Sequence, residues 1–270
     1  MLRVHYRYCP VERPEVRPKW FSKQLGLVSF AQSLKQYFSS SVRSNDVKWT
    51  LYIDRFEELN SDENGLLYKL SKQFDIKIVK LKTKSNTKAY QCVLNEACLA
   101  DDKDKILFVE DDYLWLPEAI MEMNWTMDAI PEVDYLTPYD HPVRYDFDYY
   151  GGVDLPHWEN RIFLSGNRHY RTQESTCMTF MTRGKVIKHD RSLHLMYSPE
   201  DKKCPNDREL FRRLQHLGGY IHNIDEKRLL LGPMPSLATH VHEPYLAPII
   251  DWEKLANTIK KEYQKLINSL

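Results

Sequence analysis

Short apolar segments alternate with longer amphipathic ones from Leu2 to Asp112. The apolar segments are rich in β-branched and aromatic residues, which predicts β-strands. The predicted strands are Leu2–Tyr8, Val47–Asp54, Ile76–Leu81 and Ile106–Val109. The segments between them repeat apolar residues at helical spacing and predict helices that begin near Trp20, at Asp62 and after a Ser85 N-cap. This order of strands and helices predicts a parallel, twisted sheet flanked by helices.

The strand Ile106–Val109 is followed directly by Glu110, Asp111 and Asp112. Its run of apolar residues predicts a strand buried on both faces, as in the centre of a parallel sheet. Ligands of open α/β sheets bind at the carboxyl ends of the strands, where this acidic triplet would lie. Adjacent carboxylates repel one another unless a cation lies among them, and their oxygens suit Mg²⁺ or Mn²⁺. The triplet therefore predicts a cation site, with a solvated acidic turn as the alternative.

Prolines interrupt the segment Cys9–Lys19 and predict a long extended loop after the first strand. Arginines lie on or near this loop at Arg7, Arg13 and Arg17. Each is either a solubilising charge or a guanidinium that faces a phosphate or a base.

The pattern changes after Asp112 and predicts a smaller, partly antiparallel region. The expected elements are a helix at Glu118–Ala129, a short strand at Val133–Pro138, a loop at Tyr139–Trp158, a hairpin of Arg161–Leu164 with His169–Thr172, a β-prone segment at Ser175–Met181, a helix from about Lys185, a helix at Asp207–Leu217 stopped by Gly218 and Gly219, a strand at Tyr220–Ile224, an extended segment at Met234–His242 and a helix at Trp252–Leu270. The loop Tyr139–Trp158 is rich in Tyr, Asp, His and Gly, which favours a substrate-facing role.

Composition narrows the classes of function. The 270 residues are 42% hydrophobic, enough for one sizeable core, and 38 basic residues balance 38 acidic ones. Zero net charge argues against bulk electrostatic binding to nucleic acid. The sequence contains no long apolar run and no Gly-rich phosphate loop, and its five cysteines lack zinc-type spacing. We expect a cytoplasmic protein with reduced thiols.

Polar residues elsewhere are candidates for chemistry. Asp54 ends a predicted strand and is either a turn former or a nucleoside contact. Lys88 is either solvated or faces a diphosphate. Asp207 starts a predicted helix and is either a cap or a general base, with Glu209 as the competing base. The segment Arg171–Thr176 is either a surface strand or a rim that binds sugar or acceptor.

His240 and His242 lie two residues apart in the extended segment, so that both point to one face. Neutral imidazole completes a carboxylate site for Mn²⁺, which makes either histidine a partner for the acidic triplet. The alternative is an ordinary hydrogen-bonded histidine.

With these features placed, the chain resembles nucleotide-sugar-dependent glycosyltransferases of the GT-A fold, including bacterial and large-virus members. Phe108–Asp112 is similar to the DxD-type motif, with Glu110 where Asp is usual. Asn206 and Asp207 resemble the acidic pair of inverting members, with Asn206 where an acid is usual. Thr239–Val241 resembles the late histidine motif that completes metal coordination.

The resemblance implies a single α/β GT-A domain, with residues 1–112 binding nucleotide, 113–250 binding acceptor and 251–270 forming a C-terminal helix. It implies Asp112 and His240 as ligands of Mn²⁺ or Mg²⁺, and Asp207 as the base that deprotonates an acceptor hydroxyl. The implied contacts to a nucleoside-diphosphate sugar, with a UDP-sugar favoured, are Arg7, Asp54, Arg55, Lys88, Glu110 and Asp111. The implied acceptor rim for a glycan is Arg171, Glu174 and Ser175.

The predicted function is thus an inverting, metal-dependent glycosyltransferase. Two other classes use similar residues. A phosphoester hydrolase would need a denser acidic cluster, usually with two metals. A non-catalytic glycan- or nucleotide-binding module would function without Asp207.

Overall fold

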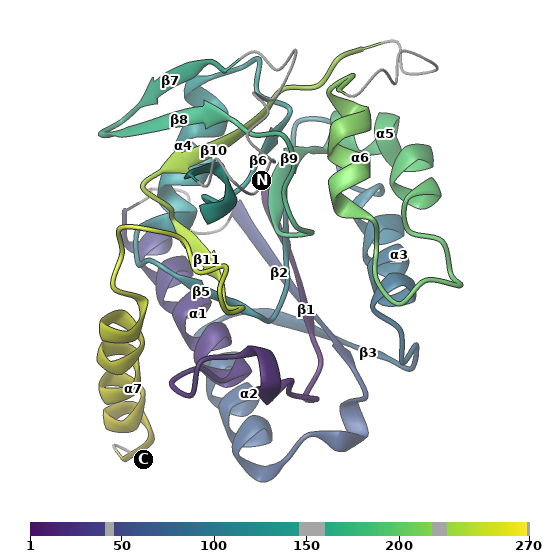
Figure 1. The fold of residues 1–270 in the computed structure, drawn as a ribbon. Coiled ribbons are helices and arrows are strands. Elements are labelled where there is room, and N and C mark those ends of the chain that lie inside the picture. The colour runs from purple at the N-terminus through teal and green to yellow at the C-terminus, as the bar shows by residue number, and fades with distance from the viewer. Residues whose placement is uncertain (41–45, 146–159, 218–225, 269–270) are drawn as a thin grey trace.

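The computed structural model describes residues 1–40, 46–145, 160–217 and 226–268. These residues form an α/β structure in which helices cover both faces of one large, twisted sheet (Figure 1). Within these ranges the sheet has nine strands, in the order β3-β2-β1-β4-β9-β6-β10-β8-β7. The predicted α/β class is confirmed.

The first half of the sheet is parallel, as the apolar segments predict. Its strands are β1 (Leu2–Tyr8), β2 (Val47–Asp54), β3 (Ile76–Leu81) and β4 (Lys105–Val109). Strand β1 pairs in parallel with β2 on one side and with β4 on the other. The carboxyl ends of these strands therefore meet at one edge of the sheet.

The second half of the sheet corrects one expectation. Strand β4 is not surrounded by parallel strands, because β9 (Phe180–Arg183) pairs with it antiparallel. The remaining strands continue outward as β6 (Tyr135–Leu136), β10 (Leu230–Met234), β8 (Arg168–Thr172) and β7 (Ile162–Ser165). An apolar run reports burial on both faces and carries no information on the direction of the neighbouring strand.

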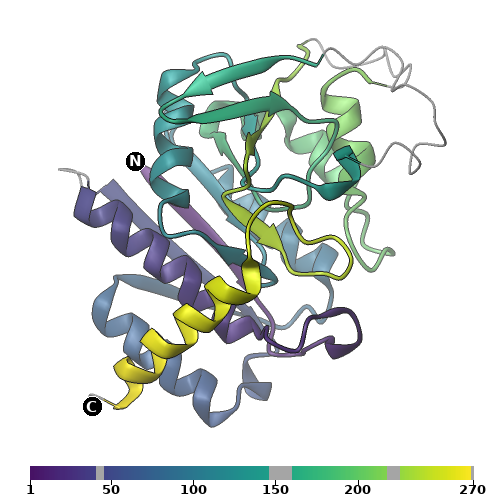
Figure 2. The ribbon, with the colours of Figure 1, turned by 60° about the vertical axis from the view of Figure 1, so that its left-hand side comes forward.

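Helices form two layers with separate apolar cores. One face of the sheet carries α1 (Lys23–Ser40), α2 (Ser61–Gln73), α4 (Ala119–Ala129) and α7 (Trp252–Asn268). The other face carries α3 (Asn86–Ala97), α5 (Gly184–Met196) and α6 (Asp207–Leu214). Strand β4 contributes to both cores, since Leu107 and Val109 join the first and Ile106 and Phe108 the second. Helix α7 packs against α1 and crosses it at an angle (Figure 2).

A small antiparallel sheet forms, as the predicted fold class includes, but from two segments whose pairing was not predicted. It pairs β5 (Tyr113–Trp115) antiparallel with β11 (Ala238–His240). The sequence pattern predicts a helix at Glu118–Ala129 and no strand in the residues between Asp112 and that helix. The pairing sets His240 opposite Tyr113, directly after the acidic triplet.

Several local predictions are confirmed. The hairpin forms as β7 and β8 around Gly166, whose φ is +59°. The Ser85 hydroxyl caps α3 by accepting from the Lys88 amide. The proline-rich loop contains one short 3₁₀ helix, Pro14–Val16.

Other expectations have no structural test. The predicted strand Tyr220–Ile224, the stop at Gly218 and Gly219, and residues 146–158 of the predicted substrate loop lie outside the described residues. The division of the chain at residues 112 and 250 stays a prediction. Within the described ranges, no helix is long and apolar enough to cross a membrane.

Candidate functional site

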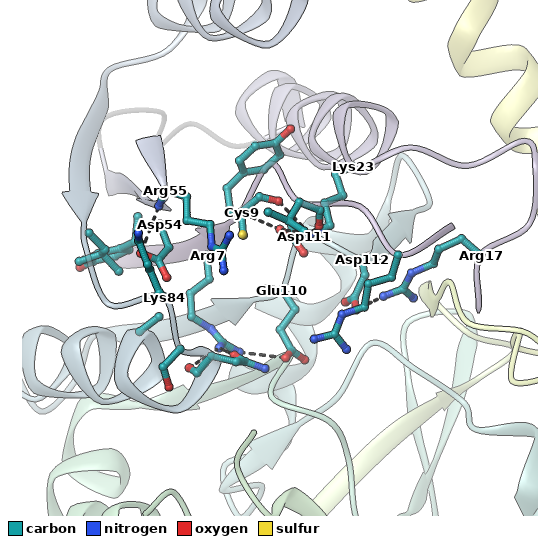
Figure 3. A pocket seen from close by; sticks show the side chains of 18 residues that line it. Arg7, Cys9, Arg17, Lys23, Asp54, Arg55, Lys84, Glu110, Asp111 and Asp112 are labelled. Carbon is teal, nitrogen blue, oxygen red and sulfur yellow. Dashed lines mark hydrogen bonds and ion pairs between the residues drawn. The ribbon is translucent and has the colours of Figure 1, made fainter. Parts of the chain in front are cut away.

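A cavity of about 240 Å³ opens at the carboxyl ends of β1, β2 and β4 (Figure 3). Its wall includes most of the predicted donor-binding side chains. Those side chains are Arg7, Asp54, Arg55, Glu110 and Asp111, and the predicted metal ligand Asp112 lies in the same wall. Buried parallel strands that end together thus gather residues that are far apart in the sequence, as the topology predicts.

Each carboxylate of the acidic triplet has its own basic partner from the N-terminal segment. The pairs are Arg7 with Glu110 at 2.9 Å, Lys23 with Asp111 at 3.1 Å and Arg17 with Asp112 at 2.7 Å. The mutual repulsion that suggested a bound cation is therefore offset by side chains of the protein itself.

The proline-rich loop is fastened to the triplet by these contacts. The backbone amide of Cys9 donates to Asp111 Oδ2 at 2.7 Å. Lys23 Nζ also donates to the carbonyl oxygens of Cys9 and Val11, each at 2.8 Å. The loop after β1 is in this way the second wall of the cavity.

Burial and charge act differently on the three carboxyl groups. Burial raises the pKa of Glu110 to about 7, although Arg7 opposes the shift. Burial also raises the pKa of Asp111 against the effect of Lys23. For Asp112, burial alone would raise the pKa, but His240 and Arg17 together hold it well below its usual range. Asp112 is therefore the carboxylate that stays charged under all ordinary conditions.

His240 lies against Asp112, as the resemblance implies. Its Nε2 is 3.2 Å from Asp112 Oδ2. Burial alone would lower the pKa of His240, but the neighbouring Asp112 carboxylate and Cys177 raise it well above its usual value. His242 stacks on His240 with ring centroids 5.7 Å apart, so the two histidines do share one face.

The corner formed by Asp112 and His240 does not have the form of a metal cradle. Asp112 Oδ2 already accepts from both Arg17 and His240, and Asp112 Oδ1 is buried with no hydrogen-bond partner among the described residues. In the described ranges, no three His, Cys, Asp or Glu side chains converge so that they could hold a metal ion. The predicted Mn²⁺ or Mg²⁺ thus has two adjacent candidate ligands, and Arg17 already contacts the carboxylate oxygen that faces His240.

Asp54 acts as a turn former and also lines the cavity. Its carboxylate accepts from the backbone amides of Arg55 and Thr83, at 3.1 and 2.9 Å, and from the Thr83 hydroxyl at 2.9 Å. Arg55 follows in the left-handed region at φ 57° and pairs with Glu58 at 3.3 Å.

A second cavity of about 150 Å³ contains the predicted base and part of the predicted rim. It is lined by Asp207, Glu174 and Ser175, together with Cys177. Burial raises the pKa of Asp207 to about 6, so that this carboxylate is mostly charged at neutral pH. Its Oδ1 accepts from the Arg208 amide at 2.7 Å at the start of α6.

His240 lies between the two cavities. It contacts Asp112, in the wall of the first cavity, and Cys177, in the wall of the second. The charge of Asp207 also acts on Glu110 across this boundary. The two hollows are therefore neighbours on the same edge of the sheet.

Arginines surround Glu174 in the second cavity. This buried carboxylate pairs with Arg144 at 2.9 Å, Arg208 at 3.5 Å and Arg212. Burial alone would raise its pKa, but the arginines lower it. Glu174 thus organises the arginines of this wall.

Besides His240, two predicted site residues lie outside both cavities. Lys88 is exposed on α3 and pairs with Glu200 at 3.2 Å, because its position in the helix turns it away from the strand ends. Arg171 pairs with Asp140 at 2.7 Å, and its guanidinium lies over the Tyr145 ring. Neither Arg171 nor these two partners line either cavity.

Basic residues that the sequence interpretation passed over also line the first cavity. Lys23 and Lys84 are among them, and Arg13 and Arg17 now have a definite place. The sequence signal for the two arginines was their position in the loop after β1. No sequence signal placed Lys84 at the cavity, because its position there depends on a left-handed backbone at φ 51°.

Known proteins resemble this chain in structure and not in sequence. No family model matches the chain, and no curated protein matches it. Solved structures align with it at low identity. S. aureus TarS aligns at 12% identity and a TM-score of 0.45 over 78% of this chain, which spans 32% of TarS.

Three further structures align in a similar way. TarS 1–349 in complex with UDP aligns at 13% identity and a TM-score of 0.47, over 86% of this chain and 60% of its own. The galactosyltransferase LgtC, in complex with donor and acceptor sugar analogs, aligns at 8% identity and a TM-score of 0.41, over 77% of this chain and 68% of its own. A 4-diphosphocytidyl-2C-methyl-D-erythritol synthase aligns at 13% identity and a TM-score of 0.37, over 74% of this chain and 80% of its own.

Proposed function

We propose that this chain transfers a sugar from a nucleoside-diphosphate sugar to an acceptor hydroxyl. The observation that carries the proposal is the charge of the first cavity. Six basic side chains and four acidic ones line it, at the carboxyl ends of parallel strands. A diphosphate would match this surplus of positive charge at the usual ligand position of such a sheet.

The individual side chains support a diphosphate in this cavity. Arg13 and Lys84 both line it, and neither side chain makes an ion pair or hydrogen bond with another described residue. Every acid of the triplet is already paired. Arg13 and Lys84 are thus available to bind an anionic ligand. Asp54 and Arg55, at the end of β2, would contact the nucleoside.

The second cavity provides an acceptor position. Asp207 is the base in this proposal, because a carboxylate with a pKa of about 6 is charged at neutral pH and can accept a proton from a sugar hydroxyl. The hydroxyl oxygen would attack the anomeric carbon from the face opposite the diphosphate. Such a single displacement inverts the anomeric configuration, by the stereochemical reasoning used for glycosidases.

The sequence also predicts that transfer depends on a divalent metal ion. Asp112 and His240 are adjacent, and a divalent cation held by them would neutralise the leaving diphosphate. The contact between Arg17 and Asp112 stands against this, since the guanidinium would have to move away. A two-metal hydrolase is favoured even less, because each acid of the triplet has a basic partner.

A thermal-shift screen tests the nucleotide site. UDP, GDP and dTDP are added to the protein, each with Mn²⁺ and with EDTA, and the melting temperature is measured. We expect at least one nucleotide to raise it. Lys84→Glu should abolish the rise, whereas Lys88→Glu, four residues on and outside the cavity, should keep it. No shift with any nucleotide would refute the proposal.

Sugar transfer is tested by nuclear magnetic resonance with the matching nucleotide sugars and a panel of glycans. We expect the anomeric signal of the donor to be replaced by that of a product with the opposite configuration. A retained configuration would contradict the role given to Asp207.

A further inference from the structure

Arg17 holds the position that a metal ion would need. Its Nη2 is 2.7 Å from Asp112 Oδ2, and its Nη1 donates to the carbonyl of Val241. Only 9% of the Arg17 side chain is exposed, and that part lies in the wall of the first cavity (Figure 3). Arg17 thus presents a fixed positive charge at the end of the acidic triplet.

The surrounding chain fixes this arginine in place. The amide of Glu243 donates to the carbonyl of Val16 at 3.1 Å, which ties the proline-rich loop to the segment after β11. The amide of Val241 donates to the carbonyl of Asp112 at 2.8 Å. Arg17 therefore joins three segments at one point, and its position does not depend on a flexible side chain alone.

The hydrogen bonds of Arg17 are incomplete. Its Nε is buried and finds no acceptor among the described residues. A buried guanidinium with an unmet donor is unusual, because most buried polar groups are paired. The exposed part of the Arg17 side chain lines the cavity, where an oxygen-rich anion can contact it, and arginine is the side chain best suited to a phosphate.

We infer that Arg17 is the resident cation that neutralises the leaving diphosphate, so that transfer proceeds without a divalent metal ion. This inference rests on the proposed function. In the step, the acceptor oxygen forms a bond to the anomeric carbon while the bond from that carbon to the diphosphate oxygen breaks. The bonding electron pair goes to the diphosphate, and the hydroxyl proton goes to Asp207.

Asp112 and His240 orient the guanidinium in this arrangement. Asp112 accepts from Arg17 and stays ionised, and His240 contacts the same carboxylate oxygen. Because Asp112 Oδ1 is buried, a hydrated metal ion would need both the removal of Arg17 and a movement of the carboxylate. The arginine thus performs the electrostatic task with no such rearrangement.

Manganese binding provides the first test, and it is independent of turnover. The electron paramagnetic resonance signal of free Mn²⁺ is measured as protein is added, without nucleotide. We expect the wild-type protein to leave the signal unchanged and Arg17→Ala to reduce it, because Asp112 and His240 then become available. Stoichiometric binding of Mn²⁺ by the wild-type protein would overturn the inference.

Turnover of the nucleotide sugar in excess EDTA provides the second test. We expect the wild-type rate to be equal with EDTA and with Mn²⁺. Arg17→Ala should lower kcat by about 100-fold or more, the usual loss for one donor that stabilises a developing anion. Arg17→Lys should recover part of the loss, and Lys19→Ala, exposed on the same loop, should behave as wild type.

The outcomes separate this inference from the proposed function. Loss of wild-type turnover in EDTA, with recovery on adding Mn²⁺, would overturn the role of Arg17 and leave sugar transfer intact. An unchanged kcat in Arg17→Ala would do the same. Failure of the wild-type protein to bind any nucleoside diphosphate or use any nucleotide sugar would overturn both.

Discussion

Replacing Asp207 with Asn should make the protein more stable and less active. Burial raises the pKa of Asp207 from 3.8 to about 6, so the charged form is less favourable in the folded protein than in the unfolded chain. Asn keeps the shape and can still accept from the Arg208 amide. The substitution therefore removes the unfavourable charge and little else.

The size of the effect follows from the pKa. A difference of this size corresponds to about 3 kcal/mol of unfolding free energy at pH 8, where the carboxylate is charged in both states. This value is already net of the favourable hydrogen bond from the Arg208 amide at the start of α6. The folded pKa is the higher one, so the cost of the charge is absent below pH 4 and complete above about pH 6. At pH 5 the gain should be roughly half of that at pH 8.

Urea denaturation of wild type and Asp207→Asn at pH 5 and pH 8 measures this difference. Asp201→Asn is the control, because Asp201 is 76% exposed and its replacement should change stability by less than about 0.5 kcal/mol. In the transfer assay, Asp207→Asn should lose about 100-fold or more in kcat, while Glu209→Gln should not. A gain that is equal at both pH values, or a loss of stability at pH 8, would refute the reasoning.

Three further predictions follow. Gly26→Ala should lower the free energy of unfolding, measured with urea, by about 1–3 kcal/mol, because the added Cβ would lie 2.8 Å from the Tyr113 carbonyl oxygen. Gly65→Ala, with open space around it, should raise the free energy of unfolding by up to about 1 kcal/mol. Glu174→Gln should cost about 3 kcal/mol by removing the buried negative charge that pairs with Arg144, Arg208 and Arg212, whereas Glu200→Gln, at an exposed carboxylate, should cost under about 0.5 kcal/mol. In a pH–rate profile, kcat/KM should fall as pH drops below about 6, because protonated Asp207 cannot accept a proton.

The parallel half of the fold was predictable because local signals agreed. Strand bounds at Leu2–Tyr8, Val47–Asp54 and Ile76–Leu81 match the structure, since each apolar segment is flanked by turn residues. The position of Glu110–Asp112 at the cavity follows from the strand before it and from the topology of parallel sheets.

The partners of the acidic triplet were not predictable in the same way. Arg17 in the proline-rich loop and Lys23 at the start of α1 reach Asp112 and Asp111 from about 90 residues earlier in the chain, and no periodic pattern encodes such contacts. The expected metal rested on repulsion among the acids, and that reasoning omitted cations that the chain itself could supply. Lys88 was expected to face a diphosphate because it lies near a helix start, but its side chain points to Glu200 instead. Closeness to a helix start does not fix the direction of a side chain.

Calorimetric titration of nucleoside diphosphates into the wild-type protein tests the central claim most directly, with inorganic pyrophosphate as the reference ligand. The proposed function predicts that at least one of UDP, GDP and dTDP binds with a stoichiometry of one and more tightly than pyrophosphate, because the cavity offers a nucleoside position beside its cations. No heat with any of the three, or binding of pyrophosphate alone, would contradict it.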